Sequence, residues 1–225
     1  MNIGQDFKSY YTKHLYKSSS NLDYYNAQVE ASMTPYVLEE RELRATQIDI
    51  FSRLMRDRIL WVAGEVNDNM STIVQAQLMY LDSVDKMDIT MHIDSPGGSV
   101  KSGLSMVDVM EFINSEIRTI NTGMAASMGS VLLGAGTKGK RSSLRFSRTM
   151  LHQSSGGFRG NIQDAKIDMI EWEKINRILF ELLGGYCGKS TEQVMQDAQR
   201  DLWLDSESAL AYGIIDEIVK TKKKG

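Results

Sequence analysis

The sequence predicts an α/β domain built around a largely parallel sheet. Short apolar runs of strand length alternate along the chain with segments whose apolar residues recur every three or four positions. Strands that alternate with helices pair mainly in parallel, because each helix supplies the crossover between them. With 225 residues, of which 42% are hydrophobic and 24% charged, the chain has the size and composition of one well-buried globular domain.

Composition also excludes several classes of protein. The 26 Lys and Arg residues against 29 Asp and Glu residues give a net charge of −3, which is too close to neutral to indicate a nucleic-acid partner. No apolar stretch approaches the roughly 18 residues that a membrane span needs. Cys187 is the single cysteine, so neither an intrachain disulfide nor a cysteine cluster for zinc can form. These features favour a reducing, cytoplasmic compartment.

The first 34 residues differ from the rest of the chain. They contain five of the nine tyrosines, few aliphatic residues and the polar run 17–21. They lack the continuous apolar core of about 7 to 15 residues that a secretory signal needs. We therefore expect residues 1–34 to be a removable leader or a mobile tail, with an arm that orders against a partner as the alternative. A single domain then spans residues 35–225.

Two strand–helix units follow in the first half of this domain. Ile59–Val66 and Ile89–Ile93 are short apolar runs and predict strands. Between them, the apolar residues from Met70 to Leu81 recur at helical spacing. Gly103–Ile113 then predicts a second helix, and Arg118–Thr122 predicts the next strand.

The second half contains a small-residue helix, a strand and the clearest helix of the chain. Ser127–Leu133 predicts the short helix, and Thr149–Gln153 predicts the strand. From about Ile162 to Leu183 an apolar stripe follows one helix face. The glycine pair Gly184-Gly185 is expected to end this helix.

The last predicted elements are short. Ser190 and Gln193 have the spacing of a capping box ahead of another helix. Gly213 is expected to close a final helix. The apolar pair Ile214-Ile215 then predicts the last strand.

Histidine is the most selective chemical marker, because the chain has only three. His14 lies in the N-terminal segment, where a fixed geometry is not expected. His92 lies inside a strand, where alternation places it on the same face as Thr90 and opposite Met91. His152 ends an apolar strand and precedes a glycine-rich loop, a common location for function. A structural histidine is the commoner alternative for His152.

Three further segments could complete a catalytic site. Ser127 lies where a strand turns into a helix, so the N–H groups of the helix could stabilise an oxyanion, although an N-cap is the commoner role of such a serine. Ser95-Pro96-Gly97-Gly98 can bring backbone close to a ligand, or simply form a tight turn. Asp201 could orient a histidine or pair with an arginine.

Together, these segments resemble the proteolytic subunits of the Clp protease family. The resemblance runs from about Val37 to Ile218, and the order and spacing of its segments make it specific. The segments that carry it are Ile50-Phe51-Ser52-Arg53-Leu54-Met55, Ser95-Pro96-Gly97-Gly98, Gly123-Met124-Ala125-Ala126-Ser127-Met128-Gly129, Lys138-Gly139-Lys140-Arg141, His152-Gln153 and Arg200-Asp201.

The resemblance implies a serine endopeptidase that hydrolyses unfolded polypeptides. Ser127 would be the nucleophile, His152 the general base, and Asp201 the residue that orients the histidine. The backbone N–H groups of Gly98 and Met128 would form the oxyanion hole. The resemblance implies no cofactor and no metal in this subunit, because ATP is used by a partner AAA+ unfoldase.

It also implies a crotonase-like superhelix of βαβ units with a protruding handle, formed by about residues 154–183. Identical subunits of this kind assemble into two stacked seven-membered rings that enclose the active sites. Arg200 would contact the opposite ring, although Gln199 replaces its usual acidic neighbour. Residues 35–48 would form the axial entrance, and residues 1–34 would be cut off.

The unfoldase would dock in an apolar cleft between neighbouring subunits. The residues that would line this cleft are Thr90, His92, Phe112, Ile120, Ser142, Leu144 and Val219. Thr90, His92 and Ser142 stand where aromatic residues are common in the family, so the cleft is expected to be more polar than usual. Asp94 and Ser154 replace an asparagine and a proline of the family pattern without removing a catalytic group.

Two other interpretations stay open. A non-catalytic or hetero-oligomeric ring subunit of the same family would keep the fold. An acyl-CoA enzyme of the crotonase superfamily would also use a backbone oxyanion hole, but it would not need Ser127, His152 and Asp201 together. Covalent labelling of Ser127 by a fluorophosphonate distinguishes that enzyme from a serine peptidase.

Overall fold

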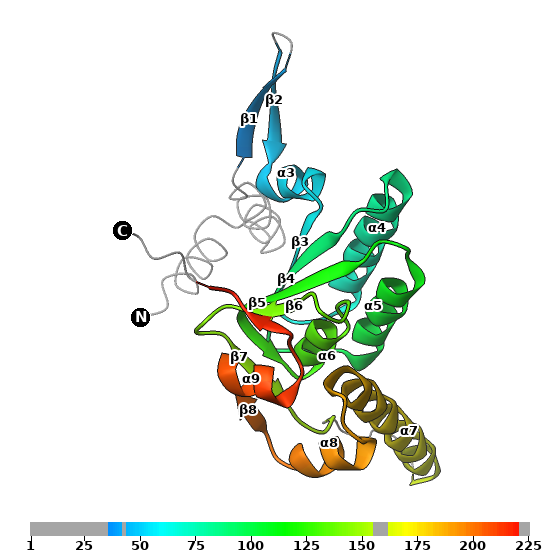
Figure 1. Cartoon of the computed structure of the whole chain (residues 1–225). Helices are drawn as coiled ribbons and strands as arrows, with labels where there is room; N and C mark the ends of the chain where they lie inside the picture. The colour runs from blue at the N-terminus through cyan, green and yellow to red at the C-terminus, as the bar shows by residue number, and fades with distance from the viewer. Residues whose placement is uncertain (1–35, 42–43, 155–161, 221–225) are drawn as a thin grey trace, which may run out of the picture. The chain divides into compact units, whose positions relative to one another are not determined.

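The computed structural model of the chain describes residues 36–41, 44–154 and 162–220 (Figure 1). The chain divides into two compact units, Met1–Leu54 and Met55–Gly225. The expected leader or tail, residues 1–34, lies outside the described residues, and so do residues 155–161 of the expected handle. Within the described ranges, no helix combines the length and apolar character that a membrane crossing requires.

The Met1–Leu54 unit contains an antiparallel hairpin. Its strands are β1 (Tyr36–Arg41) and β2 (Arg44–Asp49), with Tyr36 opposite Asp49. Asp49 then starts α3 (Ile50–Arg56), because its carboxylate accepts a hydrogen bond from the Ser52 backbone N–H at 2.9 Å. Hydrogen bonds from Ser52 lower the pKa of Asp49. The hairpin falls within the expected entrance segment, whose role stays a prediction.

The Met55–Gly225 unit is built on a sheet with the predicted pairing. Its strands are β3 (Ile59–Ala63), β4 (Ile89–Ser95), β5 (Ile117–Ala126), β6 (Arg141–Ser143), β7 (Arg148–Leu151), β8 (Leu202–Leu204) and β9 (Glu217–Ile218). Their order is β3-β4-β5-β6-β9, and β7 pairs with both β5 and β8. Every pair is parallel except β7 with β8. The predicted α/β class with much parallel pairing is confirmed.

The long strand β5 pairs with β4 and, in its two halves, with two further strands, β6 and β7, and this division positions the site. Its first half, Thr119–Asn121, pairs with β6, and its second half, Met124–Ala126, pairs with β7. The end of β5 therefore lies beside the end of β7, with Ala126 opposite Met150. Residues that follow these two strands can then meet.

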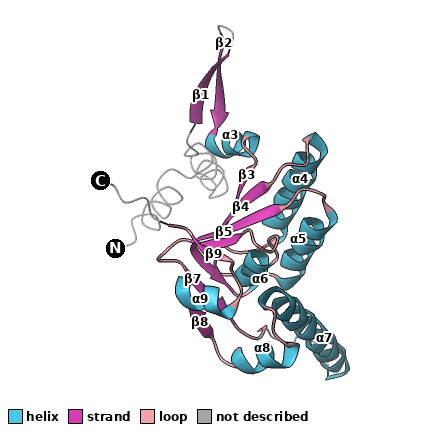
Figure 2. Ribbon diagram, viewed as in Figure 1, coloured by secondary structure: helices cyan, strands magenta, loops and turns pink. Residues whose placement is uncertain are grey.

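The predicted helices are present in this unit (Figure 2). They are α4 (Asp68–Val84), α5 (Val100–Phe112), α6 (Met128–Gly134), α7 (Ile162–Cys187), α8 (Thr191–Asp197) and α9 (Ser206–Tyr212). Helices α4, α5, α8 and α9 begin at side chains that accept a hydrogen bond from a first-turn N–H, namely Asn67, Ser99, Ser190 and Asp205. The predictions for Ser190 as a cap and for Gly213 as the end of α9 are confirmed.

The core lies where one face of the sheet meets the helices. Met91 and Ile93 of β4 are fully buried and belong to the same apolar cluster as Leu78 of α4. Thr90 and His92 alternate with them and are half-buried on the opposite face. The predicted alternation along β4 is therefore confirmed.

The end of α7 differs from the prediction. The pair Gly184-Gly185 does not end the helix, which continues to Cys187. Gly188 adopts the left-handed conformation instead, with φ of 67°. The N–H groups of Gly188 and Lys189 donate to the carbonyls of Gly185 and Gly184, which is the Schellman pattern of a helix end. Gly184 serves packing, because a Cβ there would lie 2.9 Å from the Lys189 carbonyl oxygen.

The predicted strand at Ile214-Ile215 is wrong. Both side chains are buried in the core, and the chain joins the sheet only afterwards, as β9. Asp216 makes this connection, because its N–H donates to the Arg141 carbonyl at 2.7 Å and its carboxylate accepts from the Arg141 guanidinium. The apolar pair thus indicates burial rather than strand pairing. The three-residue strands β6 and β8 are too short for the sequence to predict them.

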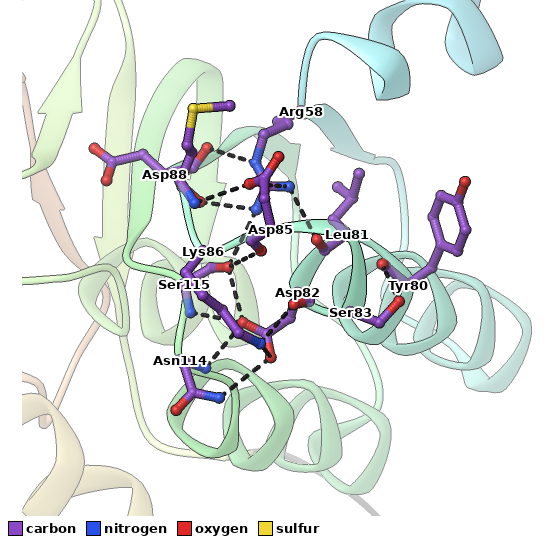
Figure 3. Close-up of polar contacts among 11 residues, drawn as sticks. Arg58, Tyr80, Leu81, Asp82, Ser83, Asp85, Lys86, Asp88, Asn114 and Ser115 are labelled. Carbon is purple, nitrogen blue, oxygen red and sulfur yellow. Dashed lines mark hydrogen bonds and ion pairs between the residues drawn. The ribbon is translucent and has the colours of Figure 1, made fainter.

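A polar network encloses the C-terminal end of α4 (Figure 3). The Asp82 carboxylate accepts hydrogen bonds from Lys86 Nζ at 2.7 Å and from Ser115 N and Oγ, each at 2.8 Å. Arg58 Nη1 donates to the Leu81 carbonyl at 2.9 Å. The bonds to Asp82, that of Lys86 foremost, hold the pKa of its carboxyl well below the usual value of 3.8.

We expect Asp82→Asn to lower the stability of the chain at pH 7, with a loss that shrinks progressively below about pH 4. The ionised carboxylate contributes stability above the unfolded-state pKa, and this contribution fades as the pH falls toward the lower folded-state pKa. Urea unfolding midpoints at pH 7, 4, 3 and 2 measure it, with Asp108→Asn at an exposed carboxylate as the control. A loss that is the same at all four pH values would contradict the expectation.

Candidate active site

Ser127 stands between β5 and α6 in a strained backbone conformation. Its φ of 54° and ψ of −123° are rare for a residue with a side chain. The backbone is held there by a hydrogen bond from the Ser127 N–H to the Met150 carbonyl of β7, at 2.9 Å. The Ser127 side chain makes no capping bond to α6, so the alternative of an ordinary N-cap is wrong. Its hydroxyl is available for another partner.

That partner is His152, which directly follows β7. His152 Nε2 lies 2.9 Å from Ser127 Oγ, and His152 Nδ1 lies 3.4 Å from Asp201 Oδ1. The antiparallel pairing of β7 with β8 produces this arrangement, because Leu151 is opposite Leu202 and the next residues, His152 and Asp201, are therefore neighbours. A hydroxyl, an imidazole and a carboxylate in continuous contact can generate a nucleophile.

The site is open to solvent on the carboxylate side. The His152 side chain is 24% exposed, whereas the Asp201 side chain is 60% exposed. A polypeptide can therefore approach the three residues from outside the core. The contacts of His152 with Ser127 and Asp201 favour a catalytic histidine over a structural one.

The glycine segment 95–98 packs directly against Ser127. Gly97 has φ of 95°, and a Cβ on it would lie 2.6 Å from Ser127 Cβ and 3.0 Å from Met128 N. Glycine is therefore required by the close approach of two backbones. The Met128 amide lies at the same place, and the approach of this segment to a ligand stays a prediction.

The orientation of Gly98 follows from its bridge to Val66. The Val66 N–H donates to the Gly97 carbonyl, and the Ser99 N–H donates to the Val66 carbonyl, each at 2.8 Å. In a parallel bridge of this kind the residue between the two bonded groups turns its own N–H the other way. The Gly98 N–H thus points away from Val66.

The residues expected to line a docking cleft fall into two places. His92 and Ile120 are in register across β4 and β5, and His92 stacks on Trp61 of β3 with ring centroids 4.7 Å apart. Leu144 and Val219 line a surface hollow of about 410 Å³. The alternation of β3 places Trp61 on this face, although the sequence analysis did not single it out.

The remaining predicted residues are more scattered. Ser142 is 2% exposed and its hydroxyl donates to the Thr119 carbonyl, so it does not contribute to an exposed cleft in the single chain. Phe112 at the end of α5 is 76% exposed. Arg200 is exposed beside Asp201. Burial lowers the pKa of His92, which favours its neutral form.

The described residues hold no cluster of three or more His, Cys, Asp or Glu side chains that could bind a metal ion. The site brings together the serine, the histidine, the aspartate and the backbone amides. This set is suited to nucleophilic attack on a carbonyl followed by transfer of the acyl group to water.

A family model and two similar proteins point to the same kind of protein. A family model described as Clp protease matches residues 41–222. The chain is 47% identical over 218 residues to an ATP-dependent Clp protease proteolytic subunit of Bacteroides fragilis (strain YCH46), which covers 96% of this chain and 99% of the relative. It is 43% identical over 220 residues to a protein of the same description from Porphyromonas gingivalis, covering 97% and 99%. The matched range contains all three site residues.

Proposed function

Because the chain belongs to the Clp protease family, as a proteolytic subunit of the ATP-dependent Clp protease and a serine peptidase, we propose that Ser127, His152 and Asp201 are its catalytic triad. The observation that carries this proposal is the continuous contact from Ser127 Oγ through the imidazole to the Asp201 carboxylate. The strained backbone of Ser127 supports it, because strain of this kind persists where a site requires it.

The reaction begins as Ser127 Oγ attacks the carbonyl carbon of a peptide bond and passes its proton to His152 Nε2. Asp201 holds the proton on Nδ1 and stabilises the imidazolium. The C–N bond then breaks as His152 returns the proton to the leaving amine, which leaves an ester on Ser127. A water molecule, deprotonated by His152, attacks this ester. The bond from the acyl carbon to Ser127 Oγ then breaks, His152 returns the proton to Oγ, and the new carboxyl terminus is released.

We propose that the N–H groups of Gly98 and Met128 bind the oxyanion of the tetrahedral intermediate. The support is positional, since the glycine segment abuts Ser127 and Met128 and the Gly98 N–H points away from its strand neighbour. Each donor of this type contributes about 3 to 4 kcal/mol to transition-state stabilisation.

ATP is used by the partner protein, because the ATP dependence of the protease resides in a Clp ATPase. The substrates that we propose are unfolded polypeptides delivered by this AAA+ partner. We place the particle in the cytoplasm, because a chain with one cysteine and no disulfide suits a reducing compartment.

We infer that identical subunits form two stacked seven-membered rings. The support is α7, whose 26 residues carry Ile167 and Ile170 on the surface at 66% and 57% exposure. Apolar side chains exposed in this way need a partner surface. In this proposal residues 154–183 form the handle between rings, Arg200 contributes to the same contact, and residues 35–48 form the axial entrance.

The ATPase is proposed to dock in a cleft that these separate residues complete between neighbouring subunits, with Ser142 buried beside it. The residues are Thr90, His92, Phe112, Ile120, Leu144 and Val219. Thr90 and the imidazole of His92 make this cleft more polar than an aromatic lining would be. A docking loop with polar groups beside its apolar anchor fits such a cleft. Tight retention of a purely apolar loop peptide in a pull-down would contradict this expectation.

Native mass spectrometry of the purified protein, with and without a fluorophosphonate, tests the function. We expect fourteen-subunit particles, with one covalent adduct per subunit located on Ser127. Absence of the adduct from an assembled particle would indicate a non-catalytic ring subunit. Acyl-CoA turnover without an adduct would indicate a crotonase-type enzyme and overturn the proposal.

A further inference from the structure

The chain just beyond His152 is fastened to α7 by three hydrogen bonds. Ser154 N and Ser154 Oγ both donate to Asn176 Oδ1, at 3.1 and 3.0 Å, and Trp172 Nε1 donates to Ser154 Oγ at 2.6 Å. Trp172 and Asn176 are four residues apart and lie on one face of the helix. Ser154, Trp172 and Asn176 are called the α7 clasp below.

The clasp leaves the Ser154 hydroxyl with one orientation. This hydroxyl accepts from the indole N–H and donates to the amide oxygen of Asn176, so its hydrogen and one lone pair both have partners. The three side chains are half-buried, which limits competition from water. The backbone at residue 154 is thereby fixed to the helix through both its N–H and its side chain.

His152 is consequently held from two directions. On one side Leu151 pairs with Leu202 of β8. On the other side only Gln153, an exposed residue, separates His152 from the clasp. The chain from His152 to Ser154 spans two residues and can extend to at most about 7 Å. Because this connection is so short, a displacement of Ser154 also displaces the imidazole.

We propose that the α7 clasp is a positioning element for the catalytic base, and this inference rests on the proposed role of His152. The clasp sets the distance from His152 Nε2 to Ser127 Oγ by holding the end of the segment that carries the imidazole. Its hydrogen bonds join the three residues to one another, and they act on the imidazole through the chain between His152 and Ser154. Proline at position 154, as in the family pattern, has neither the N–H nor the hydroxyl, so the clasp depends on serine being at this position.

The test is the rate of Ser127 acylation by a fluorophosphonate, together with kcat and KM for a fluorogenic peptide, on assembled full-length protein. We expect Asn176→Ala to lower the acylation rate and kcat by about tenfold, because small misplacements of a catalytic group are costly, and to leave KM unchanged. Trp172→Phe removes the indole N–H together with the pyrrole part of the ring and should act in the same direction with a smaller effect. Gln193→Ala on α8, which removes an amide side chain and its exposed hydrogen bond to Asp197, is the control and should match the wild type.

A double-mutant comparison separates the clasp from a general effect on stability. Ser154→Pro abolishes all three bonds, so adding Asn176→Ala to it should change the acylation rate by less than twofold. A second tenfold loss in that background would show that Asn176 acts elsewhere and would overturn the proposal. Equal acylation rates for Asn176→Ala and the wild type would also overturn it while leaving the function intact, whereas labelling away from Ser127 would overturn the function itself.

Discussion

Ser127→Ala is expected to lower peptidase turnover by a factor on the order of 10⁴ or more, because it removes the nucleophile on which the rest of the triad acts. Alanine has a Cβ at the same place, so the backbone strain at φ of 54° is unchanged and the fold should persist. Turnover of a fluorogenic peptide is the measurement, with protein prepared from a host that lacks its own Clp protease.

The matched control is Ser83→Ala. Ser83 is an exposed serine whose hydroxyl donates only to the Tyr80 carbonyl of its own helix, so its removal should leave turnover within twofold of the wild type. Native mass spectrometry should show both variants assembled as the wild type. If assembled Ser127→Ala retained a tenth of wild-type turnover, another residue would have to be the nucleophile.

Gly98→Ala is expected to lower kcat by about 10²- to 10³-fold, the loss that follows removal of one oxyanion donor. A Cβ at this position would lie 2.3 Å from the Val66 carbonyl oxygen and 2.8 Å from Val66 N. The bridge between the two segments must therefore open, and the Gly98 N–H moves away from the site. The acylation rate of Ser127 by a fluorophosphonate should fall in parallel with kcat.

Gly139→Ala separates this steric effect from simple backbone strain. Gly139 also has a positive φ, 87°, but a Cβ there would meet no atom within 4 Å. Alanine in this backbone region costs roughly 1–2 kcal/mol of stability wherever it occurs, so both variants lose stability. Only Gly98→Ala should lose activity at a temperature where both are folded. A comparable loss of activity in Gly139→Ala would remove the case for Gly98 in the oxyanion hole.

Much of the fold could be predicted because its signals are local. The alternation along β4 and the helical spacing of α4 each depend on a few neighbouring residues, and the structure agrees with both. The predictions were wrong where a residue fits a local sequence pattern but is placed by its tertiary contacts. Position 184 is glycine because the packing inside the helix leaves no room for a side chain. Position 214 is apolar because its side chain is buried, although it lies outside a strand.

The segments that form the candidate site could be predicted, but the arrangement of their side chains could not. Ser127 and His152 each had a commoner structural explanation, and spacing in the sequence could not choose between the explanations. The clasp partners of Ser154 were not predictable, because Trp172 and Asn176 look like ordinary members of a long helix.

The sequence by itself determined the alternating α/β class, the presence of the helices α4 to α9 and the segments that carry reactive side chains, since these depend on propensity and periodicity within a few turns of chain. Only the tertiary structure decided that the ends of β5 and β7 and the start of β8 lie side by side and so bring together residues 127, 152 and 201. The physical reason is that strand pairing joins segments far apart in the chain. Contacts between segments that are far apart in the chain produce no periodic pattern in the sequence.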